Sequence, residues 1–451
     1  KYVYEHHGQL TPEEEMLLFS IPVLLGNLFQ QFYNMVDTII VGRYLGEEAL
    51  AAVGSTGCLM FLVLGFANGI AQGFGVMVSH AFGAKDFKLL RHYVALSLIL
   101  TLIISLLLTI PTVTASRLLL AWMHTPENII AMADAYIKVI FAGILLTMAY
   151  NVLSGILRGI GDSRTPLYFL ILSSVLNIIL DVVLIVYTGL GTAGAAYATI
   201  IAQGVSAVLC FFYMYRKYEI LRTRREDYYL DSAGVKNMLA IGVPMALNYS
   251  ITAIGTMIMQ SAVNVFGSSV VAAFTAASKV SNIATQSMPT LGTAMATYCG
   301  QNLGAGKYDR IYAGMRQGLF LCFGAAATAA AICIFGGRFI VSWFVSNPSE
   351  EIFSSAMQYL TIASWFFLPL AMIFLYRNAL QGLGEGLVPM LSGVIELVCR
   401  FVAIALLQKP LGYQGICLAD PAAWVGAGIP LMITYIIWKS KKIRQHSNSP
   451  A

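Results

Sequence analysis

Long runs of apolar residues follow one another along the chain, and short segments rich in charge, glycine or proline separate them. A run of roughly 20 apolar residues is long enough for a helix to cross the hydrocarbon core of a membrane. Runs such as LSLILTLIISLLLTI also lack the alternation of polar and apolar residues that a membrane-spanning strand requires. The pattern predicts twelve transmembrane helices, in two sets of six, near residues 16–41, 49–80, 91–115, 130–158, 165–188, 193–215, 235–265, 271–300, 313–344, 353–380, 388–408 and 415–438.

The composition supports an all-α integral membrane protein and excludes a water-soluble fold. Hydrophobic residues make up 58% of the 451 residues and charged residues only 11%, whereas a soluble domain carries roughly 25% charged residues. The mean hydropathy is +0.74. The seven cysteines lie singly within apolar runs, which indicates core residues rather than disulfides or metal ligands. The polar start of the sequence lacks the pattern of a cleaved signal, so we expect the first helix to be retained.

Basic residues indicate which side of the membrane each connection occupies. They are concentrated in alternate connections, above all in the segment 216–234 and after residue 438. The opposite connections hold only Arg43, Arg117, Arg338 and Lys409. Because basic connections tend to stay in the cytoplasm, we expect both termini and the segment 216–234 to be cytoplasmic. The net charge of +5 is then an orientation signal, and no nucleic-acid partner is expected.

The two sets of six helices also resemble each other in sequence. Residues 157–166 read LRGIGDSRTP and residues 380–389 read LQGLGEGLVP, so a leucine, two glycines, an acid and a proline recur at an offset of 223. Because six is an even number, both sets enter the membrane from the same side, which predicts two lobes related by a pseudo-two-fold axis along the membrane normal. The expected domains are a tail at 1–15, an N-lobe at 16–215, a charged, flexible cytoplasmic linker at 216–234, a C-lobe at 235–438 and a tail at 439–451.

Three acidic residues fall well inside predicted spans: Asp37, Asp181 and Glu396. An ionisable group at membrane depth is costly, so it is a functional hypothesis by default. The repeat places Ile258 or Met259 opposite Asp37 in the alignment, and Ile404 opposite Asp181. Packing alone therefore does not demand carboxylates at these two positions. We favour a functional role for the pair over a buried polar network without function.

The predicted depths bring four polar residues of the N-lobe to one level. Asp37 and Asp181 both lie near the outer ends of their helices, Asn177 precedes Asp181 by one turn, and Thr199 lies early in the sixth helix. Their oxygen atoms suit a small cation such as sodium. Alternatively, two nearby carboxylates in a low-dielectric interior can share a proton. Neutralising the pair in either way removes a repulsive charge and favours a repacked arrangement of the helices.

The C-lobe carries a different polar cluster. Glu396 and Arg400 are one helical turn apart in the eleventh predicted helix, and Asp420 lies in the twelfth. The repeat alignment places these three where the N-lobe has Ser173, Asn177 and Thr199. We favour a structural salt bridge over a direct role in transport, and the alternative stays open.

The sequence gives no indication of an enzyme. The segment LGAGKY at 303–308 lacks the first glycine and the final serine or threonine of a phosphate-binding loop, so ATP is not the expected energy source. The six histidines lie in tails or at the ends of spans and form no metal or nucleophile pattern. We expect no cofactor beyond a coupling proton or sodium ion.

Three segments carry a resemblance to a known family: LFQQFYNMVDTIIVGRYLG at 28–46, the repeated ILRGIGDSRTP and ALQGLGEGLVP, and GQNLGAGKYDR at 300–310. Together they resemble the MATE family, the multidrug and toxic compound extrusion transporters. The resemblance implies two six-helix lobes and export of cationic or amphipathic compounds by alternating access, in exchange for inward proton or sodium flow.

Within that family the sequence is similar to the prokaryotic DinF-like and related branches. This similarity implies a cation site at Asp37, Asn177, Asp181 and Thr199, flanked by Tyr33, Tyr136 and Asn151. Acids that other branches carry in the seventh and tenth helices have no counterpart here. The expected protein is a monomer in the plasma membrane of a prokaryote, with amphipathic or cationic small molecules and the lipid bilayer as its partners.

Two other functions remain open. A flippase for lipid-linked precursors, from the same superfamily, would need a cationic cavity, and we expect only Lys279 and Arg400 to be basic well inside spans. A membrane channel or receptor is a second alternative, which the duplication and the acids of one lobe disfavour. The identity of the substrate, and the choice between protons and sodium, do not follow from the sequence.

Overall fold

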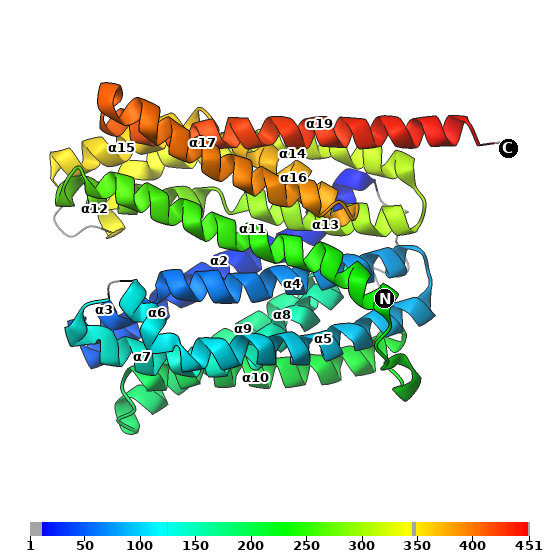
Figure 1. Cartoon of the computed structure of the whole chain (residues 1–451), viewed down its shortest axis with the longest axis horizontal. Coiled ribbons are helices and arrows are strands. Elements are labelled where there is room, and N and C mark those ends of the chain that lie inside the picture. The colour runs from blue at the N-terminus through cyan, green and yellow to red at the C-terminus, as the bar shows by residue number, and fades with distance from the viewer. Residues whose placement is uncertain (1–10, 124, 345–348, 450–451) are drawn as a thin grey trace. The chain divides into compact units, whose positions relative to one another are not determined.

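The computed structural model describes residues 11–123, 125–344 and 349–449, and these residues form helices and connections without any strand (Figure 1). Each of the twelve expected runs is helical. Within the described ranges, nine helices are long and apolar enough to cross a membrane, or eleven when two bent pairs are counted as spans. The remaining run, expected at 271–300, forms the more polar helices α12 (Ser268–Ala284) and α13 (Ser287–Gly304). The all-helical membrane fold is therefore confirmed.

The chain divides into two compact units. Of the described residues, the first unit takes 21–250 and 304–306, and the second takes 11–20, 251–303 and those after 306. The helices of the first unit are α2 (Pro12–Leu45), α3 (Glu47–Ser55), α4 (Gly57–Gly83), α5 (Phe87–Thr114), α6 (Ser116–Trp122), α7 (Glu127–Ala142), α8 (Ile144–Gly159), α9 (Arg164–Asp181), η1 (Val182–Tyr187), α10 (Thr192–Lys217), η2 (Glu219–Leu221) and η3 (Arg225–Asp227). Those of the second unit, besides α12 and α13, are α11 (Ser232–Asn264), α14 (Tyr308–Phe344), α15 (Glu350–Ser364), α16 (Phe367–Gly382), α17 (Leu387–Leu411), α18 (Tyr413–Cys417) and α19 (Ala419–Ser447). Helices α2 and α11 contribute long stretches to both units, and α13 contributes its last residue, Gly304, to the first unit.

The boundaries of the helices repeat the sequence duplication. The pair α7–α8 bends by 50°, and the pair α15–α16 bends by 55°. The first helix of each pair begins at Glu127 or Glu350, and the second ends at Gly159 or Gly382, at an offset of 223 in both cases. The two halves therefore share their helix breaks as well as their sequence landmarks.

One local difference separates the halves. After Asp181, helix α9 widens into the π-helical segment η1, whereas its counterpart α17 continues as a regular α-helix to Leu411. Single-turn π segments are rare and occur often at functional sites. The departure from the regular helix begins directly after one of the two N-lobe carboxylates.

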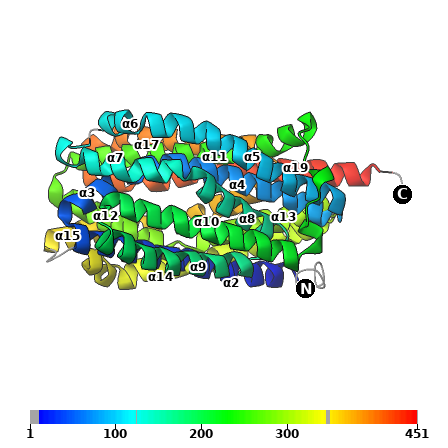
Figure 2. The ribbon, with the colours of Figure 1, turned by 90° about the horizontal axis from the view of Figure 1, so that it is seen from below.

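Small residues let the helices of the first unit approach closely. A Cβ atom added to Gly73 of α4 would lie 2.3 Å from the Cα atom of Gly242 in α11, and one added to Gly75 would lie 2.8 Å from the carbonyl oxygen of Gly155 in α8. Such contacts suit a membrane, where helices associate by packing of small residues rather than by the hydrophobic effect. Helices α9 and α10 also pack along each other in this unit (Figure 2).

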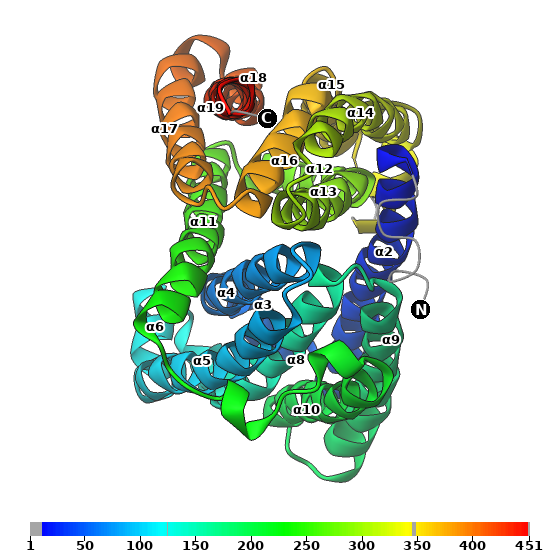
Figure 3. The ribbon, with the colours of Figure 1, turned by 90° about the vertical axis from the view of Figure 1, so that its right-hand side faces the viewer.

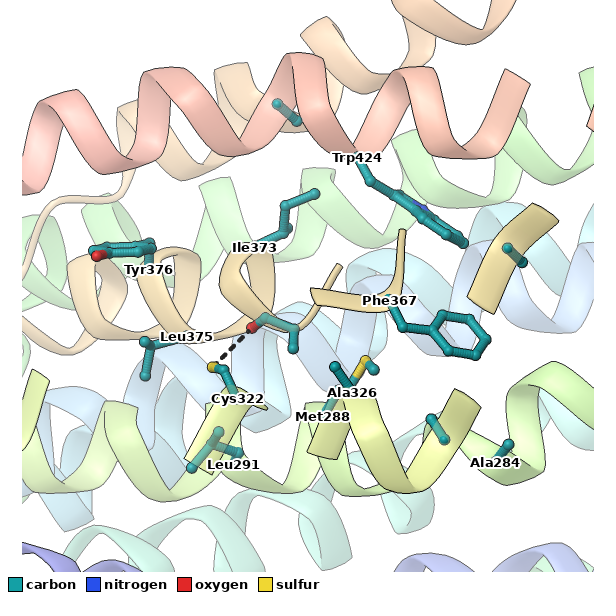
Figure 4. Close-up of a cluster of buried hydrophobic side chains, with 14 of the residues drawn as sticks. Ala284, Met288, Leu291, Cys322, Ala326, Phe367, Ile373, Leu375, Tyr376 and Trp424 are labelled. Atoms are coloured by element: carbon teal, nitrogen blue, oxygen red, sulfur yellow. Dashed lines mark hydrogen bonds between the residues drawn. The ribbon is translucent and has the colours of Figure 1, made fainter. Parts of the chain in front are cut away.

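The core of the second unit lies among α12 to α16 and α19. Figure 4 shows Phe367, Trp424 and Met288 among the side chains of this cluster. The Cys322 thiol donates to the carbonyl oxygen of Ala371 at 3.5 Å, which joins α14 to α16. The described cysteines are all free thiols, and five of the seven are buried.

The linker is more ordered than its composition predicts. The His92 ring of α5 lies 3.0 Å from the carbonyl oxygen of Asp227 and 2.7 Å from the Asp231 carboxylate, and it stacks on Tyr229. The hydrogen bond with His92 holds the pKa of Asp231 below its usual range. The Tyr218 hydroxyl donates to Asp162 at 2.5 Å. These contacts tie the linker to the first unit, although a charged and aromatic sequence suggests a flexible one.

Candidate functional site

Two carboxylates of the first unit lie close together. Asp37 belongs to α2 and Asp181 is the last residue of α9, and the two side chains are near enough to interact directly. Asp181 is fully buried. Apart from the contact between the two carboxyl groups, Asp37 Oδ1 and both carboxylate oxygens of Asp181 are buried without a hydrogen-bond donor in the part of the chain that the structure describes. Buried polar atoms in folded proteins almost always have a partner, so this pair is an exception that calls for an explanation.

Asn177 links these carboxylates to two hydroxyl groups. It lies one turn before Asp181 on α9, and its Nδ2 donates to the Tyr33 hydroxyl and, at 3.4 Å, to Thr199 Oγ1. Thr199 Oγ1 in turn donates to the carbonyl oxygen of Ala195 at 3.1 Å. The amide oxygen of Asn177 is buried and accepts no hydrogen bond from any residue within 11–123, 125–344 and 349–449. A fourth unpartnered oxygen thus joins the three carboxylate oxygens.

Two tyrosines lie beside the carboxylates. Tyr33 of α2 and Tyr136 of α7 both interact electrostatically with Asp37 and Asp181. Tyr136 is 5% exposed. The structure therefore brings six of the seven expected residues together. The seventh, Asn151 of α8, is half-buried and makes no hydrogen bond to the six within the part of the chain that the structure describes.

The local fold explains this convergence. Helix α9 lies between α2 and α10, as the view along the bundle shows (Figure 3). The spacing of four residues puts Asn177 and Asp181 on one face of α9. The same spacing puts Tyr33 and Asp37 on one face of α2. Two helices that each present a pair of polar residues one turn apart can therefore build one site.

The chemistry of these side chains suits a hard cation. Carboxylate, amide and hydroxyl oxygens are the ligands that such ions take in proteins. No group of three or more His, Cys, Asp or Glu residues that could hold a metal ion occurs in residues 11–123, 125–344 and 349–449. The four unpartnered oxygens fit a monovalent cation or a shared proton.

In the polar cluster of the second unit, by contrast, the carboxylate oxygens have hydrogen-bond donors. The Arg400 guanidinium donates to Asp420 at 2.7 Å and to Glu396 at 3.1 Å. Arg377 donates to the other oxygen of Glu396 at 3.0 Å and to Ser392 at 3.2 Å. The Tyr359 hydroxyl donates to the second oxygen of Asp420 at 2.9 Å. Every carboxylate oxygen of this cluster has a donor, and its two arginines balance its two acids.

Arg377 and Tyr359 were not predicted as members of this cluster. The expectation that only Lys279 and Arg400 are basic well inside spans is wrong, because Arg377 lies in α16 and pairs with Glu396. A charge count would have pointed to it, since two buried acids with one arginine leave an uncompensated charge. Its position one turn before the end of a predicted span concealed it.

A family model described as MatE matches the chain twice, over residues 22–183 and 244–406. The two matches start 222 residues apart and end 223 residues apart, which is the offset of the internal repeat. The duplication inferred from short motifs therefore extends over most of each half.

Similar proteins match over nearly the full length. The probable multidrug resistance protein YpnP of Bacillus subtilis (strain 168) is 29% identical, over 95% of this chain and 96% of that protein. The FAD transporter of Shewanella oneidensis is 26% identical, over 94% of this chain and 95% of that protein. A crystal structure of MATE in the bent conformation has a TM-score of 0.90 at 24% identity, over 97% of this chain and 98% of that chain. The last match shows that the folds are alike.

Proposed function

The chain belongs to the MatE family of membrane transporters, and from this premise we propose that it is a secondary exporter of amphipathic or cationic small molecules. In this proposal an inward-moving proton or sodium ion drives export by alternating access. The first unit supplies the coupling site, at Asp37, Asn177, Asp181 and Thr199, with Tyr33 and Tyr136 beside it and Asn151 further away. Resistance proteins among the relatives support the class of substrate.

One observation carries the proposal. Four buried oxygen atoms, from Asp37, Asn177 and Asp181, have no hydrogen-bond donor among the described residues. A pair of buried, uncompensated carboxylates is unfavourable, because desolvation and mutual repulsion both act against the charged state. A bound cation or proton relieves both effects. The free energy of binding is then available to favour one packing of α2 against α9 over another, which is how a ligand drives a two-state change.

Export follows from the order of events. On the outer side, a cation or proton enters the site and neutralises the carboxylates while the substrate leaves. The neutral pair permits the inward-open arrangement, where the cation is released to the cytoplasm. The charged pair then favours the arrangement that accepts substrate. Because each state is selected by the occupancy of one site, cation and substrate move in opposite directions.

The paired arginines argue against the flippase. Arg377 and Arg400 each donate to carboxylates of the same cluster, so neither charge is left to hold a pyrophosphate group. We further propose a monomer in a prokaryotic plasma membrane, with both termini cytoplasmic and with lobes at 16–215 and 235–438. The cytoplasmic assignment rests on the basic connections.

Dye efflux from inverted vesicles tests the proposal. We expect either an imposed proton gradient or an imposed sodium gradient to drive transport by the parent, and we expect Asp37→Asn and Asp181→Asn to abolish it. Asp134→Asn is the matched control, because Asp134 of α7 has its own partners, Ser116 at 2.6 Å and Lys138 at 3.4 Å. The site assignment is wrong if both site variants transport as well as the control.

A further inference from the structure

The two polar clusters share three positions of the repeat. At an offset of 223, Tyr136 corresponds to Tyr359 and Asn177 corresponds to Arg400. At an offset of 221, Thr199 corresponds to Asp420. In the first unit these three positions surround the carboxylate pair. In the second unit they carry a guanidinium (Arg400), a carboxylate that it donates to (Asp420) and a tyrosine that donates to the same carboxylate (Tyr359). The two clusters are versions of one site, and they differ in what neutralises their oxygen atoms.

The Arg400 guanidinium lies where a cation would be expected in such a site. It bridges Asp420 and Glu396, with donor distances of 2.7 and 3.1 Å. The side chain of Arg400 is 14% exposed, and those of its two partners are 13% and 12% exposed. No side-chain oxygen of Glu396 or Asp420 is among the unpartnered buried atoms of the described chain. In the proposed function, the first unit takes its positive charge from solution as a cation or proton. In the second unit the positive charge is part of the chain, as the Arg400 guanidinium.

The surrounding residues make room for the longer side chain. A Cβ atom added to Gly255 of α11 would lie 3.0 Å from Arg400 Nη1. Gly255 is the counterpart of Tyr33 at the offset of 222 that relates Pro22 to Pro244. In the first unit the tyrosine hydroxyl accepts from Asn177. In the second unit the absence of a side chain leaves that space to the guanidinium.

The positions of the carboxylates in the two repeats agree with a guanidinium in place of a bound cation. The counterparts of the two N-lobe carboxylates are apolar, Ile258 or Met259 for Asp37 and Ile404 for Asp181. The acids of the second unit instead occupy the positions of Ser173 and Thr199. The carboxylates have thus moved to positions from which they reach the arginine. A salt bridge unrelated to the repeat would not require acids to be absent at the positions of Asp37 and Asp181 and present at those of Ser173 and Thr199.

We propose that Arg400 is a tethered cation, which holds the repeat-equivalent of the coupling site permanently in its occupied state, so that only the first unit binds and releases a cation. This inference rests on the proposed function for its meaning in transport. The occupancy itself is a property of the second unit, and it can be measured without transport.

The test uses the purified full-length protein with Asp37→Asn, which removes the first site from the measurement. Arg400→Asn is added, because asparagine is the residue at this position of the first repeat. Thermal unfolding is followed with sodium chloride or methylguanidinium chloride, and choline chloride at equal concentration controls for ionic strength. We expect sodium or methylguanidinium to raise the Tm of the Arg400→Asn protein by roughly 2–4 °C more than choline does, as for a ligand that binds only the folded state. The Asp37→Asn protein alone should show no such difference.

A matched control separates this effect from general destabilisation. Arg338 donates to Glu350 at 2.7 Å in an exposed pair, so Arg338→Asn removes an arginine of the same unit without opening the cluster. An equal response of Arg338→Asn and Arg400→Asn to the cations, or no response of either, overturns the inference. Arg400→Lys provides a second reading if the asparagine variant does not fold, because lysine keeps a tethered charge. A stable Arg400→Lys protein that ignores added cations supports the inference, and one that needs them contradicts it.

The outcome is distinguishable from failure of the proposed function. If efflux by the parent survived Asp37→Asn and Asp181→Asn, the coupling assignment would fail, whatever the unfolding measurements showed. If those variants lost efflux but Arg400→Asn gained no response to cations, the coupling assignment would stand and the tethered cation would not.

Discussion

The first and second units of this transporter each carry a polar cluster at partly equivalent positions of the repeat. The clusters differ in whether their carboxylate oxygens have hydrogen-bond donors. In the first unit, Asp181 is buried and Asp37 is half-buried, and three of their carboxylate oxygens are buried without a hydrogen-bond donor in the described part of the chain. In the second unit, Glu396 and Asp420 are largely shielded from solvent, and every one of their carboxylate oxygens has a donor. In our proposal, the missing donors leave the first cluster free to bind a ligand, and the complete set of donors holds the second cluster in one arrangement. A duplicated fold can therefore use one half to bind and release a ligand while the other half keeps a fixed structure.

The largest expected effect comes from breaking the satisfied cluster. Arg400→Leu should lower the free energy of unfolding by about 3–5 kcal/mol, because it leaves two buried carboxylates without their main donor. Thermal unfolding of the purified protein, followed with a thiol-reactive dye on the five buried cysteines, measures this effect. A Tm equal to that of the parent would show that the cluster does not stabilise the second unit.

A matched tyrosine pair should sharpen the comparison. Tyr359→Phe removes a hydrogen bond to a charged carboxylate and should destabilise the protein by about 1.5–3 kcal/mol. Tyr136→Phe, at the equivalent position of the first repeat, should cost less stability and should instead slow ion-driven efflux. Unfolding and efflux assays on both variants test this separation. Equal losses of stability from the two variants would contradict the proposed difference.

Removing an unsatisfied charge should have the opposite sign. Asp181→Asn replaces a fully buried carboxylate, which has no hydrogen-bond donor in the described part of the chain, with a neutral side chain of the same shape. We expect the free energy of unfolding to rise by about 1 kcal/mol, while coupled transport is lost. Functional sites are often strained at the expense of stability, so such a trade is expected. The proposed difference between the two clusters is contradicted if Asp181→Asn lowers the free energy of unfolding as much as Arg400→Leu does.

The smallest effect is expected at Asn151. This residue of α8 makes no hydrogen bond to the other six residues of the candidate site in the described part of the chain. Asn151→Ala should change the free energy of unfolding by less than about 0.5 kcal/mol, and efflux should stay near that of the parent. A loss of efflux as large as that of Asn177→Ala would place Asn151 in the coupling site.

Much of the fold was predictable because eleven of the twelve expected runs are long and apolar enough to cross a membrane. The positions of all twelve runs, and the convergence of Asp37, Asn177 and Asp181, follow from helical spacing and depth. The bends within α7–α8 and α15–α16 were not predicted, since an apolar run does not reveal a change of direction. The sequence VVLIVY also does not indicate the π-helical segment that follows Asp181.

The second cluster shows a different limit. Glu396 and Arg400 were expected to pair because they lie four residues apart on one helix. Arg377 and Tyr359 reach the cluster from α16 and α15, and the pairing depends on which faces of these helices meet. Spacing along the sequence does not determine such contacts between helices.

Movement of the cation driven by the substrate tests the central claim most directly. In proteoliposomes, an imposed gradient of a cationic dye substrate should drive a proton or a sodium ion in the opposite direction, which an ion-sensitive dye reports. The account predicts this exchange for the parent and for Asp134→Asn, and none for Asp181→Asn. Undiminished exchange by Asp181→Asn would contradict the claim that the carboxylate pair of the first unit couples ion flow to export.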